Sequence, residues 1–133
     1  MSFTIEDMIL TAEERYEMKF LAGKNGWANS ISWVHLLEDT TIIQNFWGKE
    51  LAVTTGLGFP QKEDWMNLAR LLNKYHASGL IINVGQYIYE VPEELKVYCD
   101  ENDLPLLTVP WEVHLSDMIK DFSIHVFLQD HTY

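Results

Sequence analysis

The residues best suited to bind a ligand form a short run in the middle of the chain, Thr54-Thr55-Gly56-Leu57-Gly58, between an apolar segment and a helical pattern. Glycine backbone N–H groups and threonine hydroxyls beside a helix N-terminus can bind an anion or an amide. The run is not a nucleotide-binding motif. A dinucleotide-binding turn would have a third glycine where Gln61 stands, and a nucleotide phosphate loop would end in Gly-Lys-Ser/Thr, which is absent here. Two interpretations stay open, a modest ligand site and a tight strand-to-helix turn, and we favour the turn.

Two further loops carry polar and aromatic side chains at equivalent positions. Asn83 and Gln86 stand at the end of one expected strand, and Trp111 stands at the end of the next. Because the carboxyl ends of parallel strands meet at one edge of a sheet, these loops should converge with residues 54–58 on a pocket. The two amides offer hydrogen bonds, while Trp111 or Tyr87 offers a flat face for a heterocycle. The alternative is that the amides cap turns and Trp111 closes the sheet edge.

Residues for catalysis or metal binding are sparse. His35 stands in an apolar segment near Glu38 and Asp39 and could act as a pocket-facing acid or base, although a partly exposed strand histidine is the favoured interpretation. Only one cysteine is present, Cys99, and the histidines form no His-x-x-x-His pair, which disfavours a zinc site. We assign no catalytic residue, no metal and no cofactor, and we predict a protein that is not an enzyme.

The elements that must position these residues follow a regular order. Strands are expected to begin near residues 51, 80 and 106, and a helical pattern follows each of them. Two earlier strands, at 18–22 and 31–36, should extend the sheet or pair at its edge. The pattern predicts a single α/β domain in which three successive strand–helix units form a mainly parallel sheet, with two N-terminal strands added.

Two helices have apolar residues that bear on packing. A helix capped at Asp39 or Thr40 should turn one stripe toward the core, and its members are Ile42, Ile43, Phe46 and Trp47. The last helix, about 114–128, carries Ile124, Phe127 and Leu128 beside its core face. Because a surface helix does not expose such a side to water, we expect these three residues to contact a second copy of the chain or a further domain.

The charge of the chain limits its partners. The 133 residues include 9 Lys and Arg against 20 Asp and Glu, a formal net charge of −11. Such a surface repels phosphate backbones and acidic membranes, so we expect no binding to DNA, RNA or membranes by this chain. The first residues lack the pattern of a signal peptide, and no apolar run approaches the length of a membrane helix. The sequence therefore predicts one cytoplasmic domain.

Several motifs together resemble a known family. They are residues 21–26 (Leu-Ala-Gly-Lys-Asn-Gly), 31–35 (Ile-Ser-Trp-Val-His), 50–58 (Glu-Leu-Ala-Val-Thr-Thr-Gly-Leu-Gly), 91–95 (Val-Pro-Glu-Glu-Leu) and 104–110 (Leu-Pro-Leu-Leu-Thr-Val-Pro). Across nearly the whole chain, the sequence resembles the N-terminal domain of PucR-like (purine catabolism regulator) bacterial transcription regulators. The Trp-Val-His strand and the Glu-Leu-Ala-Val-Thr-Thr-Gly run are the specific part of the resemblance.

The resemblance implies a sensing role for residues 1–133. Regulators of this family respond to purine breakdown products or other nitrogen metabolites and bind DNA through a C-terminal helix-turn-helix, which this chain lacks. A purine-derived effector and a homodimer are the partners it implies, and Thr54, Thr55, Gly56 and His35 carry over as ligand-binding or structural positions. The alternative is a protein-interaction or dimerisation module that binds no ligand.

Overall fold

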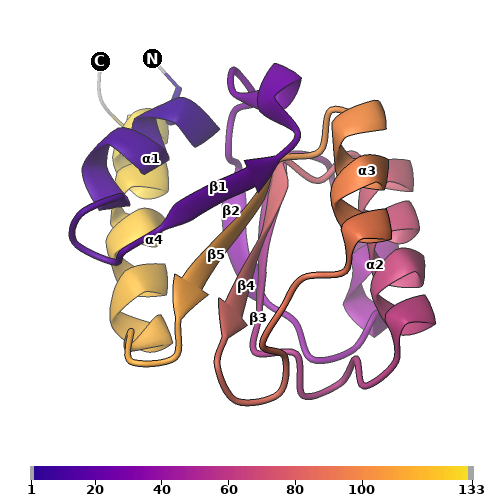
Figure 1. Cartoon of the computed structure of the whole chain (residues 1–133). Coiled ribbons are helices and arrows are strands. Elements are labelled where there is room, and N and C mark those ends of the chain that lie inside the picture. Colours follow the sequence, from indigo (N-terminus) through magenta and orange to yellow (C-terminus); the bar gives the residue numbers. More distant parts are fainter. Residues whose placement is uncertain (1, 132–133) are drawn as a thin grey trace.

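The fold is a five-stranded sheet between two pairs of helices (Figure 1), in a computed structural model that describes residues 2–131. The elements in chain order are α1 (Ile5–Ala12), β1 (Lys19–Ala22), the 3-10 helix η1 (Lys24–Gly26), β2 (Trp33–Leu36), the 3-10 helix η2 (Thr41–Asn45), β3 (Glu50–Thr54), α2 (Lys62–Lys74), β4 (Gly79–Val84), α3 (Glu93–Glu101), β5 (Leu106–Pro110) and α4 (Leu115–His131). The α/β class is confirmed.

The strands lie in the order β1-β5-β4-β3-β2. The pairs β2–β3, β3–β4 and β4–β5 are parallel, and β1 is antiparallel to β5. The sheet is thus mixed, which corrects the expected mainly parallel sheet of three strand–helix units. The reason is visible in Figure 1, where β1 delivers the chain to the edge at which the other strands begin, so it must run opposite to them.

Two hydrophobic cores lie on the two faces of the sheet. Helices α1 and α4 cover one face, with Met8, Val34 and Phe122 in that core. Helices α2 and α3 cover the other face, where Trp65 and Leu95 are buried. Every residue of β3 is buried, as expected for a strand packed on both sides. Within residues 2–131, none of the helices is both long and apolar enough to cross a membrane.

The expected helix after Thr40 is wrong. The structure has only the 3-10 helix η2, and of the predicted core stripe Ile43 is buried whereas Ile42 is 41% exposed and Trp47 is 99% exposed. The cause is Glu50, which is buried and accepts hydrogen bonds from the backbone N–H groups of Trp47 (2.7 Å) and Gly48 (2.8 Å). Because these N–H groups find their acceptor at the start of β3, the chain turns there instead of continuing a helix.

Candidate functional site

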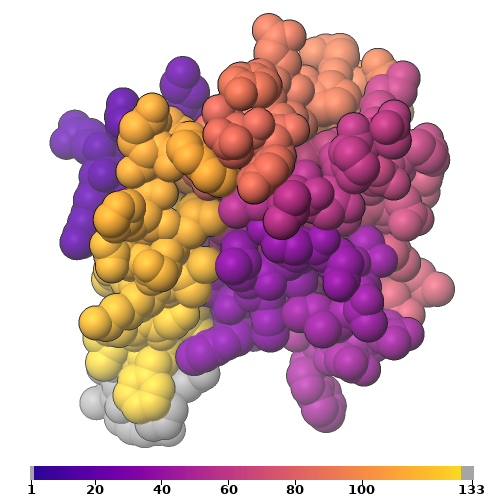
Figure 2. Space-filling model, turned by 90° about the horizontal axis from the view of Figure 1, so that it is seen from below, coloured from indigo at the N-terminus to yellow at the C-terminus, as the bar shows by residue number. Residues whose placement is uncertain are grey.

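The loops after β3, β4 and β5 lie side by side at the carboxyl end of the sheet, the face seen in Figure 2. A Cβ atom at Gly56 would lie 3.1 Å from Cγ2 of Ile88 in the next loop. One at Gly85 would lie 3.0 Å from Cβ of Trp111 in the loop after that. Both glycines also have positive φ, +89° and +123°, which other residues adopt at a cost. The loops therefore meet as predicted and pack directly against one another, while the pocket expected among them stays a prediction.

The hydroxyls of Thr54 and Thr55 are held by a carboxylate from the neighbouring strand end. The Thr54 hydroxyl donates to Glu38 Oε1 at 2.9 Å, and the Thr55 hydroxyl and N–H both donate to Glu38 Oε2, the latter at 3.2 Å. Thr54 Oγ1 in turn accepts from the N–H of Gly56 at 3.1 Å. The backbone of Glu38 also lies against Gly58, where a Cβ atom would be 1.5 Å from the Glu38 carbonyl oxygen.

Sequence reasoning missed Glu38 as part of this site. The carboxylate follows β2, and β2 pairs with β3, so the two strand ends meet although sixteen residues separate Glu38 from Thr54. A half-buried carboxylate makes the site rich in hydrogen-bond acceptors. Its two oxygens already accept the three hydrogen bonds from Thr54 and Thr55. The signal available in the sequence was an acidic residue two positions after the expected strand 31–36.

The other predicted ligand residues divide into buried and exposed ones. Asn83 is buried, and its side-chain N–H donates to the carbonyl oxygen of Pro110 at 2.8 Å, which fastens the end of β4 to that of β5. Trp111 is 40% exposed and meets Tyr87 edge to face, with ring centroids 5.8 Å apart. Gln86 is exposed. The carboxyl-end face thus exposes the aromatic pair Tyr87–Trp111 and the amide of Gln86, beside loops that pack directly against each other.

His35 lies apart from this group. Its ring stacks on Phe46, with centroids 5.2 Å apart and planes at 28°. Among residues 2–131, no hydrogen bond or ion pair joins it to Glu38 or Asp39. The structure places His35 in the edge strand β2, half-buried, as the favoured interpretation of the sequence had it.

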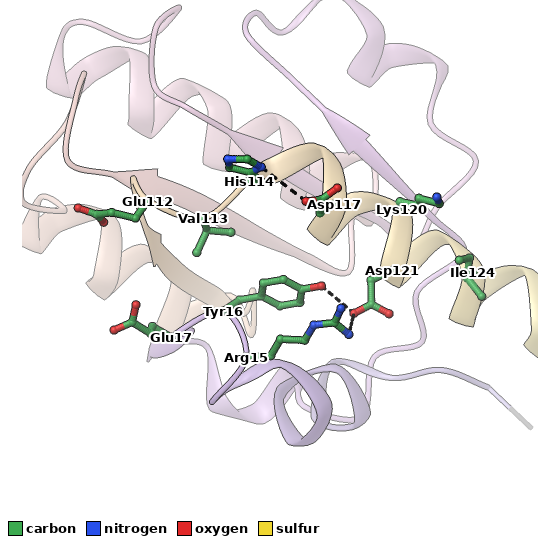
Figure 3. Close-up of a pocket in the computed structure, with 10 residues that line it drawn as sticks. All are labelled: Arg15, Tyr16, Glu17, Glu112, Val113, His114, Asp117, Lys120, Asp121 and Ile124. Carbon is green, nitrogen blue, oxygen red and sulfur yellow. Dashed lines mark hydrogen bonds and ion pairs between the residues drawn. The ribbon is translucent and has the colours of Figure 1, made fainter.

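A separate hollow of about 590 Å³ lies between the segment after α1 and the first half of α4 (Figure 3). Its centre is Asp121, whose Oδ2 accepts hydrogen bonds from the Tyr16 hydroxyl (2.8 Å) and from Arg15 (3.2 Å). Burial, together with the hydrogen bond to Asp121, raises the pKa of Tyr16 to about 12. Tyr16 therefore stays a neutral donor at ordinary pH and anchors α4, a role that the sequence did not reveal.

The predicted interface residues on α4 are half-exposed. Ile124, Phe127 and Leu128 are 49%, 53% and 50% exposed. The same end of α4 is fastened to the sheet by Gln129, whose side-chain N–H donates to the Ile31 carbonyl oxygen at 2.7 Å. Its side-chain oxygen accepts from the N–H of Phe3.

The single cysteine offers no surface chemistry. Cys99 is fully buried, and this burial raises the pKa of its thiol to about 12, so a thiolate does not form at ordinary pH. Within the part of the chain that the structure describes, no three His, Cys, Asp or Glu residues are grouped so that they could hold a metal ion.

Comparison with known proteins adds the family. Residues 8–126 match the Purine catabolism regulatory protein-like family, and the chain belongs to this family. It is similar to the Purine catabolism regulatory protein of Bacillus subtilis (strain 168), with 24% identity over 107 residues. The matched region covers 80% of this chain but 20% of that protein, so the chain spans about a fifth of the length of the curated relative.

Proposed function

We propose that residues 1–133 form the N-terminal regulatory domain of a cytoplasmic bacterial transcription regulator that controls the catabolism of purines or other nitrogen metabolites. The observation that carries this proposal is the family match over residues 8–126, together with a curated relative that is named as a regulator. The domain acts by binding, not by catalysis. DNA is bound by another part of the regulator, because a chain with a formal net charge of −11 is a poor ligand for a phosphate backbone.

A small effector is the proposed signal, and the carboxyl-end loops are its proposed site. Of the proposed residues, Thr55, Gln86 and Trp111 are at least partly exposed on this face beside Glu38, whereas Thr54, Gly56 and Asn83 are buried directly beneath it. Purines and their breakdown products carry several N–H donors, which suit a carboxylate acceptor, and planar ones can stack on an indole. This chemistry supports a purine-derived effector that is rich in N–H groups.

Thermal unfolding in the presence of hypoxanthine, xanthine, urate or allantoin tests the proposal. A ligand at a hundredfold excess over its Kd stabilises a fold by about 2.7 kcal/mol, which gives a clear rise in Tm. The rise should be lost in Trp111→Ala and kept in Val97→Ala, a matched control on α3 that is also half-exposed. A Tm that no compound changes contradicts effector binding, and a rise that survives Trp111→Ala contradicts this location.

A second candidate function is a protein-interaction or dimerisation module without a ligand. It is favoured by one specific observation, the concentration of exposed apolar side chains between Trp33 and Trp47. Thermal unfolding distinguishes the two candidates. A small effector raises the Tm of an effector-binding domain, whereas an interaction module keeps its Tm in the presence of small molecules and shows its function in its oligomeric state.

A further inference from the structure

The two edges of the sheet differ in their protection against other chains. At one edge, β1 carries the exposed Lys19, and its register with β5 shifts between Phe20 and Ala22. Charges and irregular pairing are the usual devices that keep an edge strand from meeting another protein. At the other edge, β2 reads Trp-Val-His-Leu and pairs in regular register with β3, with neither device.

An apolar patch surrounds this unprotected edge. We call it the edge patch, and it consists of Trp33, His35, Leu36, Phe46 and Trp47. Two contacts join the segment 46–48 to β2: the rings of His35 and Phe46 stack, and the Ser32 hydroxyl donates to the Gly48 carbonyl oxygen at 2.9 Å. Leu36 lies on the opposite face of β2 from Trp33 and His35, because side chains alternate along a strand, so the patch has members on both sides of the edge. Trp47 is 99% exposed, and Trp33 and Leu36 are 44% and 50% exposed.

The backbone that carries Trp47 is held in a fixed turn. The buried carboxylate of Glu50 accepts the N–H groups of both Trp47 and Gly48, so the turn that carries the indole is held from inside the fold. A backbone turn held in advance loses less conformational entropy when a partner covers the side chain that it carries. Tryptophan is also the residue type most enriched among those that dominate binding energy at protein interfaces.

The charge distribution selects the partner. Residues 25–48 contain two charged residues, Glu38 and Asp39, and the Glu38 carboxylate is engaged by Thr54 and Thr55. Elsewhere the chain is strongly acidic, so two copies repel each other over most of their surfaces. In a two-fold symmetric dimer, the same patch of each copy contacts the other. If that patch is the edge patch, the surfaces in contact are neutral and apolar, and the acidic surfaces stay apart.

The size of the edge patch fits a dimer. With about 200–250 Å² for a whole tryptophan, Trp47 and Trp33 offer roughly 300 Å² of exposed surface per copy. A standard interface buries about 800 Å² per partner, of which somewhat more than half is apolar. Leu36, His35 and Phe46 extend the patch toward that area. We infer that a second copy of this chain binds at the edge patch, so that two sheets meet along their β2 edges.

Sedimentation velocity over a concentration series tests this inference on the 133-residue chain. The wild type should form a dimer, and Trp47→Ser should weaken it at least tenfold in Kd. The indole is exposed, so this substitution leaves the core untouched. Leu36→Asp should give a monomer at all concentrations, with unchanged circular dichroism. Leu10→Ser, an equally apolar and 76% exposed position on α1, is the matched control and should leave the dimer intact.

Three results overturn the inference. They are a wild type that stays monomeric up to millimolar concentration, a dimer that Trp47→Ser and Leu36→Asp do not weaken, and a dimer that only Phe127→Ser on α4 disrupts. This inference is independent of effector binding, because the measurement of Tm with purine compounds tests the carboxyl-end loops and not the β2 edge. Either one can fail while the other stands.

Discussion

Replacing Glu38 with alanine removes the acceptor of three donors, the hydroxyls of Thr54 and Thr55 and the N–H of Thr55, and should destabilise the protein chiefly through the first and the last, because the Thr55 hydroxyl can turn to water. The Thr54 hydroxyl is fully buried, and the N–H of Thr55 is half-buried, so water replaces the carboxylate poorly at the first and only partly at the second. A hydrogen bond to a charged group contributes about 1.5–3 kcal/mol, and a buried group left unpaired costs about 1–3 kcal/mol. We therefore expect a loss on the order of 2–4 kcal/mol in the free energy of unfolding.

Glu38→Gln separates charge from geometry in the same experiment. The amide oxygen can still accept from Thr54, but the amide nitrogen cannot accept from the N–H of Thr55, so the loss should be about half of that in Glu38→Ala. Urea denaturation gives both values as shifts in the midpoint at constant m. Glu101→Ala, which removes an exposed carboxylate from the end of α3, is the control and should stay within about 0.5 kcal/mol of wild type.

The result that refutes this reasoning is a Glu38→Ala variant as stable as Glu101→Ala. The carboxylate would then not hold the threonine hydroxyls in solution, and the loop at residues 54–58 would owe its shape to glycine conformation and packing alone. A large loss in Glu38→Ala with none in Glu38→Gln would mean that only the bond to Thr54 contributes.

Two further predictions concern groups with shifted pKa values. Tyr16→Phe should lower the free energy of unfolding by about 1 kcal/mol, because it removes the hydrogen bond to Asp121. The pKa of Tyr16 is raised from its ordinary 10.0 to about 12, so the wild type should also lose stability as the pH rises from 10 to 12. Urea midpoints measured across this pH range should show that loss in the wild type and not in Tyr16→Phe. Burial raises the pKa of the Cys99 thiol to about 12, so this thiol should react with an aromatic disulfide reagent at pH 8 only after the protein unfolds. The reaction is followed by absorbance. Fast labelling of the native protein would contradict this expectation and show that the core around α3 opens readily.

Local patterns in the sequence predict those parts of the fold that depend on near neighbours. The α2 stripe of Trp65, Leu68 and Leu72 is buried as its spacing indicates. The capping box of Thr4 and Asp7 forms, because both of its hydrogen bonds lie within one helical turn.

Features that depend on distant partners could not be predicted in the same way. Trp47 follows a helical spacing but lies in water, because a carboxylate at the start of β3 captures its N–H. The antiparallel direction of β1 depends on the place of β1 at the edge of the sheet, beside β5, and no local sequence pattern determines that place. Glu38 belongs to the candidate site only because β2 pairs with β3. The meeting of the three loops, by contrast, followed from the parallel direction expected for β3, β4 and β5, and it is present.

The proposed binding of a small effector to this domain can be examined without knowing the effector in advance. Native mass spectrometry of the protein purified gently from cells tests it most directly, because the method preserves non-covalent contacts. We expect a mass that exceeds that of the chain, or of its dimer, by one small metabolite per copy, and we expect Trp111→Ala to lose this excess. A bare mass that stays bare after incubation with hypoxanthine, xanthine, urate and allantoin would contradict the proposed binding.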